Sequence, residues 1–141
     1  MSQYTSLRAK IAAESAARRA RYAEFEAAWQ RAMIAGMEAG NAAAPTPMVV
    51  TQTAGITDKV TNQWYVSEGA CGFAEVVFPG NTSFARWAKS RDLVRKAWPS
   101  GVSYWVAAHG QSVDRKDAHA RAVARVLGEA GIQCYATSRL D

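Results

Sequence analysis

Cys71-Gly-Phe-Ala-Glu-Val-Val-Phe78, followed by Pro79-Gly80, carries the clearest strand signal in the sequence. It combines β-branched and aromatic residues between turn-forming ones, which is the pattern of a buried strand. On either side of it, we expect strands at 48–52, 63–66, 102–108 and 132–137. Helices are expected from 81 or 82 to about 98 and from 112 to 129, the latter closed by Gly131. Because helices alternate with strands after residue 71, we predict an α/β fold, with a small mixed, partly parallel sheet and two crossover helices.

A long amphipathic α-helix is predicted to precede this sheet, over residues 6–39. The segment contains no proline, and fifteen of the first 44 residues are alanine, the best helix former. Large apolar residues recur on one face, namely Tyr4, Leu7, Ile11, Tyr22, Phe25, Trp29, Met33 and Met37. At about 1.5 Å per residue the helix would overhang a small domain. The alternative is a kink near Ser15 that folds the helix back onto the domain.

Two prolines, Pro45 and Pro47, end the helix and define a linker. We therefore expect a helical segment at 1–40, a linker at 41–47 and an α/β domain at 48–141. If the helix overhangs, its apolar stripe (Leu7, Ile11, Phe25, Trp29 and Met33) would contact another protein or a second copy in a homodimer.

Composition excludes several classes of protein. Hydrophobic residues make up 49% and charged residues 21% of the 141 residues, which is typical of a globular domain. No apolar run approaches the roughly 20 residues needed to span a bilayer, so we expect no membrane partner. Two cysteines, Cys71 and Cys134, and two histidines offer no zinc-binding spacing, so we expect no metal and no cofactor. We expect the cysteines to be reduced thiols, with a single disulfide as the alternative.

Positive charge is concentrated in residues 86–125. The net charge of the chain is +5, whereas this segment holds nine basic against three acidic residues. The nine are Arg86, Lys89, Arg91, Arg95, Lys96, Arg115, Lys116, Arg121 and Arg125. If both predicted helices cover one face of the sheet, these side chains form a surface suited to phosphate contacts on DNA or RNA. The alternative is an ordinary solvated surface.

The strand at 71–78 resembles the signature of the RNA-recognition-motif family, which alternates glycine, aromatic and aliphatic residues. Gly72, Phe73, Ala74, Val76 and Phe78 fit that signature. Cys71 departs from it by replacing a basic residue, and Glu75 by replacing an aromatic one that would stack on a base. The resemblance implies RNA binding through this strand, whereas the alternative is a buried strand with Glu75 paired or at an edge.

The sequence also permits two enzymatic interpretations. Cys71 and His109 could form a nucleophile–base pair only if the fold brings them together. A small metal-dependent nuclease would use Asp58, Glu75 and Asp114 as ligands, with Lys116 as the catalytic lysine. A pocket, if present, is expected at the carboxyl end of the 102–108 strand, lined by Trp105, His109, Gln111, Ser112 and Lys116. No residue is expected to be catalytic.

The C-terminal half also resembles a group of short proteins encoded by tailed bacteriophages that has no assigned activity. The resemblance is carried by Cys71-Gly-Phe-Ala74, Phe84-Ala-Arg-Trp87, Gln111-Ser112 with Arg115-Lys116, and Ser138-Arg-Leu-Asp141. It implies a bacterial cytoplasm or a virion as the setting. The sequence thus favours a non-enzymatic phage accessory protein that binds nucleic acid through basic helices. The alternatives are a protein-binding module (a virion or assembly component, or an inhibitor of a host or defence factor) and the nuclease.

Overall fold

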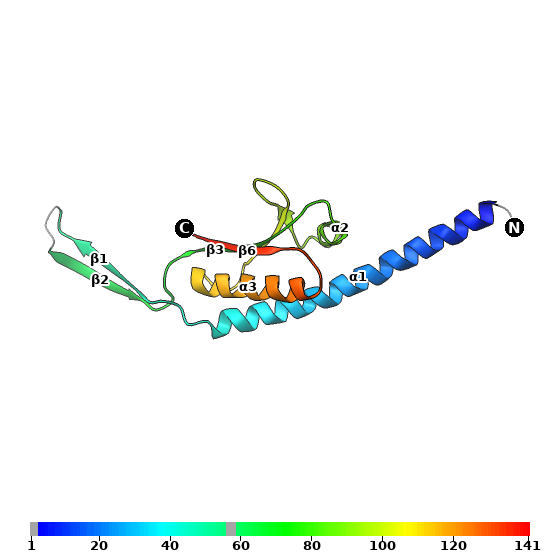
Figure 1. Ribbon diagram of the computed structural model, residues 1–141. Coiled ribbons are helices and arrows are strands. Elements are labelled where there is room, and N and C mark those ends of the chain that lie inside the picture. Colours follow the sequence, from blue (N-terminus) through cyan, green and yellow to red (C-terminus); the bar gives the residue numbers. More distant parts are fainter. Residues whose placement is uncertain (1–2, 56–58) are drawn as a thin grey trace.

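A single unbroken helix, α1 (Gln3–Ala42), runs along most of the molecule in the computed structural model, which describes residues 3–55 and 59–141. The predicted helix is confirmed, and it passes straight through Ser15, so the folded-back alternative is wrong. Its N-terminal half projects from the body (Figure 1). Tyr4, Leu7 and Ile11 are each more than half exposed there.

The C-terminal half of α1 packs on the last helix, α3 (Val113–Glu129), through small residues. Ala28, Ala32, Gly36 and Gly40 recur at every fourth position and are buried on one helix face. A Cβ added to Gly36 would lie 2.8 Å from the ring of His119 on α3. The small residues therefore let the two helices approach closely, and this half of α1 is part of the same core as the sheet.

Four strands and two helices follow one another as β3 (Gly72–Phe78), α2 (Ser83–Ser90), β4 (Arg95–Lys96), β5 (Val102–Trp105), α3 and β6 (Tyr135–Leu140). In space the strand order is β4-β5-β3-β6, and each neighbouring pair is antiparallel. The two strands joined by each helix point the same way but are separated by a third, which is a split βαβ arrangement.

This topology confirms the α/β class and the two crossover helices but corrects the predicted mixed sheet. Each hydrogen-bonded pair of neighbouring strands in the part of the chain that the structure describes is antiparallel. The alternation of helices and strands was interpreted correctly, but each crossover skips one strand. Parallel neighbours therefore do not arise.

Local signals set the helix boundaries. The Thr82 hydroxyl accepts a hydrogen bond from the Ala85 N–H and caps α2, as predicted. Gly131, with φ of 83°, closes α3 as predicted. The first crossover helix is shorter than the predicted 81–98. It ends at Ser90, and Arg95 and Lys96 lie on the short edge strand β4.

One face of the sheet forms the core. Ala74, Val76 and Phe78 of β3 are buried on that face against residues of all three helices. Figure 1 shows α1 and α3 stacked on one side of β3 and β6. The opposite face of the sheet carries the alternate side chains of each strand.

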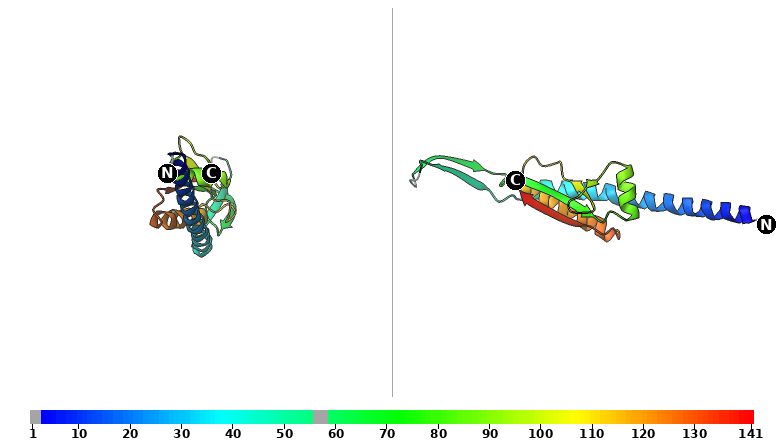
Figure 2. Two further views of the ribbon diagram at one scale, coloured as in Figure 1. Left: turned by 90° about the vertical axis from the view of Figure 1, so that its right-hand side faces the viewer. Right: turned by 90° about the horizontal axis from the view of Figure 1, so that it is seen from above.

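A separate two-stranded hairpin projects from the other end of the molecule. It pairs β1 (Met48–Thr53) with β2 (Val60–Val66), so both predicted short strands form, but in a sheet of their own. Figure 2 shows that the hairpin and the free half of α1 extend in opposite directions. None of the helices in the described ranges is long and apolar enough to cross a membrane.

Candidate nucleic-acid interface

The sheet face opposite the helices carries a shallow groove of about 200 Å³. Alternation places the outward side chains of three strands along it, because Glu75 lies opposite both Trp105 and Thr137 in the register. The side chains that line this groove, which we call the open sheet face, include Phe73, Glu75, Val77, Trp98, Trp105, Tyr135, Thr137 and Arg139.

Aromatic rings dominate the open sheet face. The rings of Phe73 and Trp105, from the two central strands, have centroids 5.1 Å apart and planes tilted by 37°. Trp98, on the loop before β5, is 91% exposed, and Tyr135 on β6 is 61% exposed. Exposed aromatic rings beside a groove are unusual on a surface with no partner and suit planar ligands.

Cations flank the two central rings. The Arg95 guanidinium carbon lies 4.3 Å from the centroid of the Trp105 ring, and that of Arg139 lies 5.7 Å from the Phe73 ring. Both arginines are exposed, so their remaining donors are available to a ligand. Arg95 was among the predicted nucleic-acid residues, whereas Arg139 was missed. The alternation of the last strand could have identified it, because Tyr135, Thr137 and Arg139 are two residues apart and therefore share one face.

The strand that resembles the RNA-recognition signature occupies the centre of the sheet. Its alternation places Ala74, Val76 and Phe78 in the core and Phe73 and Glu75 on the open sheet face. The buried-strand reading is therefore confirmed for one face only. A Cβ on Gly72 would overlap the backbone of β6, which explains the glycine without reference to a ligand.

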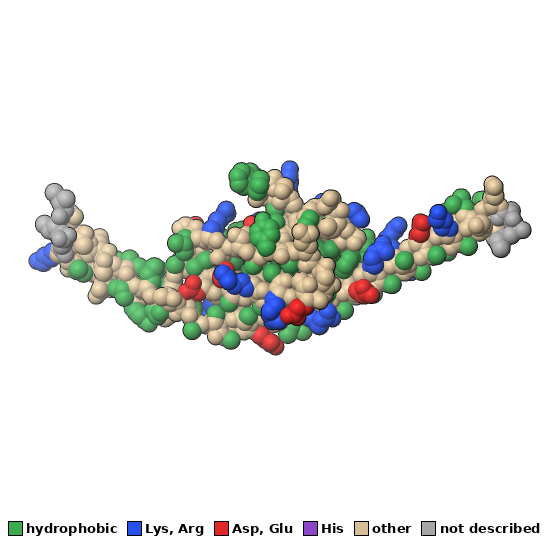
Figure 3. Space-filling view, in the orientation of Figure 1, with side chains coloured by type: hydrophobic (Ala, Val, Ile, Leu, Met, Phe, Trp, Pro, Cys, Tyr) green, Lys and Arg blue, Asp and Glu red, His purple; other side chains and the backbone are tan. Residues whose placement is uncertain are grey.

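Part of the predicted basic helical surface is engaged in contacts within the chain. Arg121 pairs with Asp117 at 2.7 Å, Arg125 with Glu129 at 3.3 Å, and Arg91 with Glu26 at 3.7 Å. Figure 3 shows positive and negative side chains interspersed over the body on the displayed face. Within the described ranges Arg86, Lys89 and Lys96 form no ion pair, and all three are exposed.

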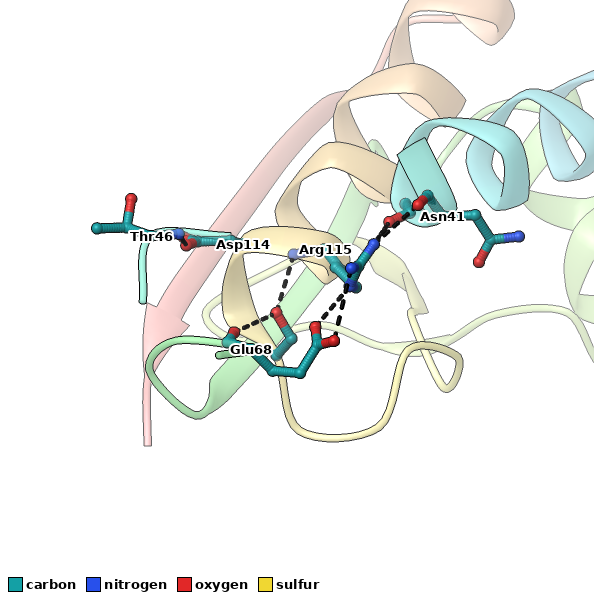
Figure 4. A network of polar contacts seen from close by, with 7 residues as sticks. Asn41, Thr46, Glu68, Asp114 and Arg115 are labelled. Atoms are coloured by element: carbon teal, nitrogen blue, oxygen red, sulfur yellow. Dashed lines mark hydrogen bonds and ion pairs between the residues drawn. The ribbon is translucent and has the colours of Figure 1, made fainter. Parts of the chain in front are cut away.

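Arg115 joins three segments that are distant in the sequence (Figure 4). Its Nη1 donates to the carbonyl oxygens of Gly40 and Asn41 at 2.9 and 2.8 Å, and its Nε donates to the Glu68 carboxylate at 2.6 Å. It therefore satisfies the last carbonyls of α1 and ties them to the base of the hairpin. A cation is unfavourable at the start of α3, but this one serves the C-terminus of α1 instead.

Asp114, beside Arg115, completes this junction by accepting a hydrogen bond from the Thr46 N–H at 2.8 Å. Lys116 is buried, and its Nζ lies 3.4 Å from the Gly72 carbonyl oxygen and 5.6 Å from the Phe73 ring. Arg115 and Lys116 therefore support the fold from within, although both were predicted as phosphate contacts.

The five residues predicted to line a pocket do not converge. Trp105 faces the open sheet face, whereas His109 contacts His119 on the core side. Ser112 is buried and caps α3, donating to the Glu68 carbonyl and accepting from the Arg115 N–H, while Gln111 is exposed. Lys116 bonds to the backbone of β3 as described above.

Two histidines and a tyrosine form a chain between α3 and the sheet. His119 is 2% exposed, with Tyr104 Oη 2.9 Å from its Nε2 and His109 Nε2 3.0 Å from its Nδ1. Burial, and then the nearby His109, lower the pKa of His119 from 6.5 to about 4. Burial also raises the pKa of Tyr104. Both ring nitrogens of His119 have partners within the protein, so this cluster of three side chains holds α3 against the sheet.

The residues named for the two enzymatic interpretations form no assembled site in the described part of the chain. Cys71 is exposed, and the Nε2 of its proposed partner His109 is engaged by His119. Both cysteines are free thiols, as expected, and burial raises the pKa of Cys134. Asp58 lies outside the described residues. Within residues 3–55 and 59–141 no group of three or more potential metal ligands occurs.

Much of the predicted partner stripe on α1 is occupied within the chain. Trp29 is 7% exposed and meets Tyr104 edge to face at 5.2 Å, Phe25 meets Phe84 at 5.4 Å, and Met33 packs on the same core. The prediction of a contact stripe is therefore narrowed to Leu7 and Ile11, which are both 54% exposed.

Comparison of the chain with protein-family models, curated proteins and solved structures gives no match. Function must therefore be argued from the chemistry of the open sheet face and of the two projecting arms.

Proposed function

We propose that this protein binds single-stranded nucleic acid across its open sheet face. The observation that carries the proposal is the pair of adjacent rings, Phe73 and Trp105, on the two central strands, each with an arginine over it. Bases of any identity can stack on such rings, and each stacked base contributes about 1–3 kcal/mol. A four-stranded sheet with central aromatic residues is one of the known ways of presenting unstacked bases to a protein.

In this proposal the groups have separate tasks. Phe73 and Trp105 would stack on two consecutive bases in the groove. Arg95 and Arg139, which carry exposed guanidinium groups, would contact the phosphates at the edges of the face. Trp98 and Tyr135 add exposed rings at one side of the groove for a further base. The proposal moves the predicted interface from the basic helices to the sheet, because the cations of α3 are engaged within the protein and the aromatic rings lie on the sheet.

Single strands are favoured over duplexes by the kind of surface available. A duplex conceals its base faces, so the aromatic rings would contribute nothing to its binding. Cations that form no ion pair within the described residues are spread over α1, α2, β4 and β6, whereas the aromatic rings are gathered in the groove. We therefore expect weak binding to duplex DNA and tighter binding to single-stranded DNA or RNA of about ten nucleotides, with moderate salt dependence.

Fluorescence anisotropy of labelled single- and double-stranded oligonucleotides, at low and at high salt, tests the proposal. We expect Phe73→Ala and Trp105→Ala each to weaken single-strand binding by about tenfold, the equivalent of one lost stacking contact. The matched control is Arg121→Ala with Arg125→Ala on α3, which removes two cations whose ion pairs lie away from the groove. It should change affinity by less than about twofold at moderate salt.

Two results would contradict binding on the open sheet face. Binding that survives both aromatic substitutions but disappears with the two α3 arginines would return the interface to the basic helices. Circular dichroism of each variant would confirm that the fold is retained. No single-strand binding at low salt would refute the proposal.

The projecting arms support a second candidate, a protein-binding role. Tyr4, Leu7 and Ile11 are exposed on the free half of α1. At the other end Trp64 is 50% and Tyr65 69% exposed on a hairpin that packs on no second sheet. An isolated two-stranded hairpin is marginally stable in water, so both arms are suited to burial against another protein or a second copy.

Light scattering at several protein concentrations tests the homodimer, and Leu7→Ser with Ile11→Ser tests the role of the helix. An apolar complex should persist at high salt, in contrast to nucleic-acid binding. The resemblance to bacteriophage proteins would place either activity in an infected bacterial cell or in a virion.

A further inference from the structure

Glu75 lies at the centre of the open sheet face, where the RNA-recognition signature would have an aromatic residue. In the register it lies between Trp105 on one side and Thr137 on the other, and it is half-buried in the groove. Within the described chain its carboxylate forms no ion pair or hydrogen bond, although Arg95 and Arg139 flank the same face. Because the side chain is only half-buried, water can bind the carboxylate oxygens in the free protein, and a ligand that displaces this water from the groove must bring hydrogen-bond donors of its own.

The chemistry of a carboxylate restricts what that donor can be. The ionised group only accepts hydrogen bonds, and its two oxygens suit a pair of adjacent N–H groups. It repels phosphate, so the backbone of a bound strand must run along the arginine-bearing edges of the face. A base that stacks on Phe73 or Trp105 would therefore present its hydrogen-bonding edge to Glu75.

The four bases differ in what they offer at this edge. Guanine presents two adjacent donors, the N1–H and the N2 amino group, and both carboxylate oxygens can be used. Adenine and cytosine present one amino group beside a ring nitrogen that is itself an acceptor. Uracil and thymine present a single N–H between two carbonyl oxygens, which repel the carboxylate.

We propose that Glu75 is a specificity-determining residue that selects guanine and disfavours uracil or thymine on the open sheet face. This inference rests on the proposed function, because it requires bases to bind there. A bidentate contact of this kind corresponds to about tenfold discrimination or more between bases.

The test uses four labelled DNA probes of about nine nucleotides, an all-thymine strand and three strands with a central guanine, cytosine or adenine. We expect the wild-type protein to bind the guanine probe about tenfold more tightly than the all-thymine probe, with the other two between them. Glu75→Gln keeps the size of the side chain but supplies a donor as well as an acceptor. We expect it to reduce the preference to about twofold or less.

Glu129→Gln is the matched control, because it removes the same charge from the exposed end of α3, away from the sheet face. It should leave the order of the four probes unchanged. A wild-type protein that binds all four probes equally, while still depending on Phe73 and Trp105, would overturn the selectivity and leave the proposed function standing. A guanine preference that persists in Glu75→Gln would overturn it as well. Absence of binding to any probe would refute both.

Discussion

Acidification is expected to destabilise this fold through His119, in a pH range above that in which most carboxylates titrate. The side chain is 2% exposed between Tyr104 and His109. Burial and the neighbouring histidine lower its pKa from 6.5 to about 4. Between these two values the unfolded chain takes up a proton that the folded protein does not. Stability is therefore fully present above pH 6.5 and declines as the pH falls.

The two pKa values set the size of the effect. Relative to pH 7.5, the free energy of unfolding should fall by about 2 kcal/mol at pH 5, and by roughly 3 kcal/mol once the pH is below 4. Burial, Arg115 and Lys116 also lower the pKa of His109, so its contribution has the same sign.

Urea denaturation followed by tryptophan fluorescence, at several pH values from 7.5 to 5, measures this loss. His119→Gln is the control, because glutamine does not titrate and the carboxylates of the two proteins titrate alike. The variant is expected to be less stable at pH 7.5, and its stability deficit should shrink by about 2 kcal/mol at pH 5. A deficit that is the same at every pH would refute the reasoning.

Two further substitutions, each with a control substitution on α3, test how α1 is held. Gly40→Ala should destabilise the fold by about 1–3 kcal/mol, because the added Cβ would overlap the His109 ring, whereas Gly128→Ala in α3 meets no neighbour and should be neutral or slightly stabilising. Arg115→Ala should cost about 1–3 kcal/mol by leaving its carbonyl and carboxylate partners unsatisfied, whereas Arg125→Ala, an exposed pair, should cost less than about 1 kcal/mol. Thermal or urea unfolding measures all four. Equal losses within either pair would contradict the assigned contacts.

Local patterns predicted most elements of the fold, because each boundary carries its own chemical signal. Thr82 and Ser112 cap their helices, Gly131 closes α3, and the prolines at 45 and 47 follow the end of α1. Strand order carries no such local signal. Whether a crossover reaches the next strand or skips one depends on long-range packing, which is why a mixed sheet was predicted.

The candidate site was only partly predictable, for a similar reason. The periodicity of β3 showed that Phe73 and Glu75 share a face. Trp105 and Arg139 join that face only because β5 and β6, about 30 and 64 residues further along the chain, pair with β3. Arg95 was assigned to a helix because β4 has two residues, too few for a periodic pattern.

The basic helices show the limit of reasoning from charge. Sequence shows where cations cluster but not which of them are paired. Arg115 is the clearest case, because its partners at the end of α1 and at the hairpin base lie 47 or more residues away. The small-residue stripe from Ala28 to Gly40 was also missed. A search for large apolar residues does not detect a helix contact that is made by alanine and glycine.

Photochemical cross-linking of a labelled single-stranded oligonucleotide, followed by mass spectrometric mapping of the attached residues, tests directly whether bases bind on the sheet. We expect adducts on the open sheet face, at Phe73, Trp98, Trp105 or Tyr135. Adducts confined to α3 or to the β1–β2 hairpin, with none on the sheet, would contradict it.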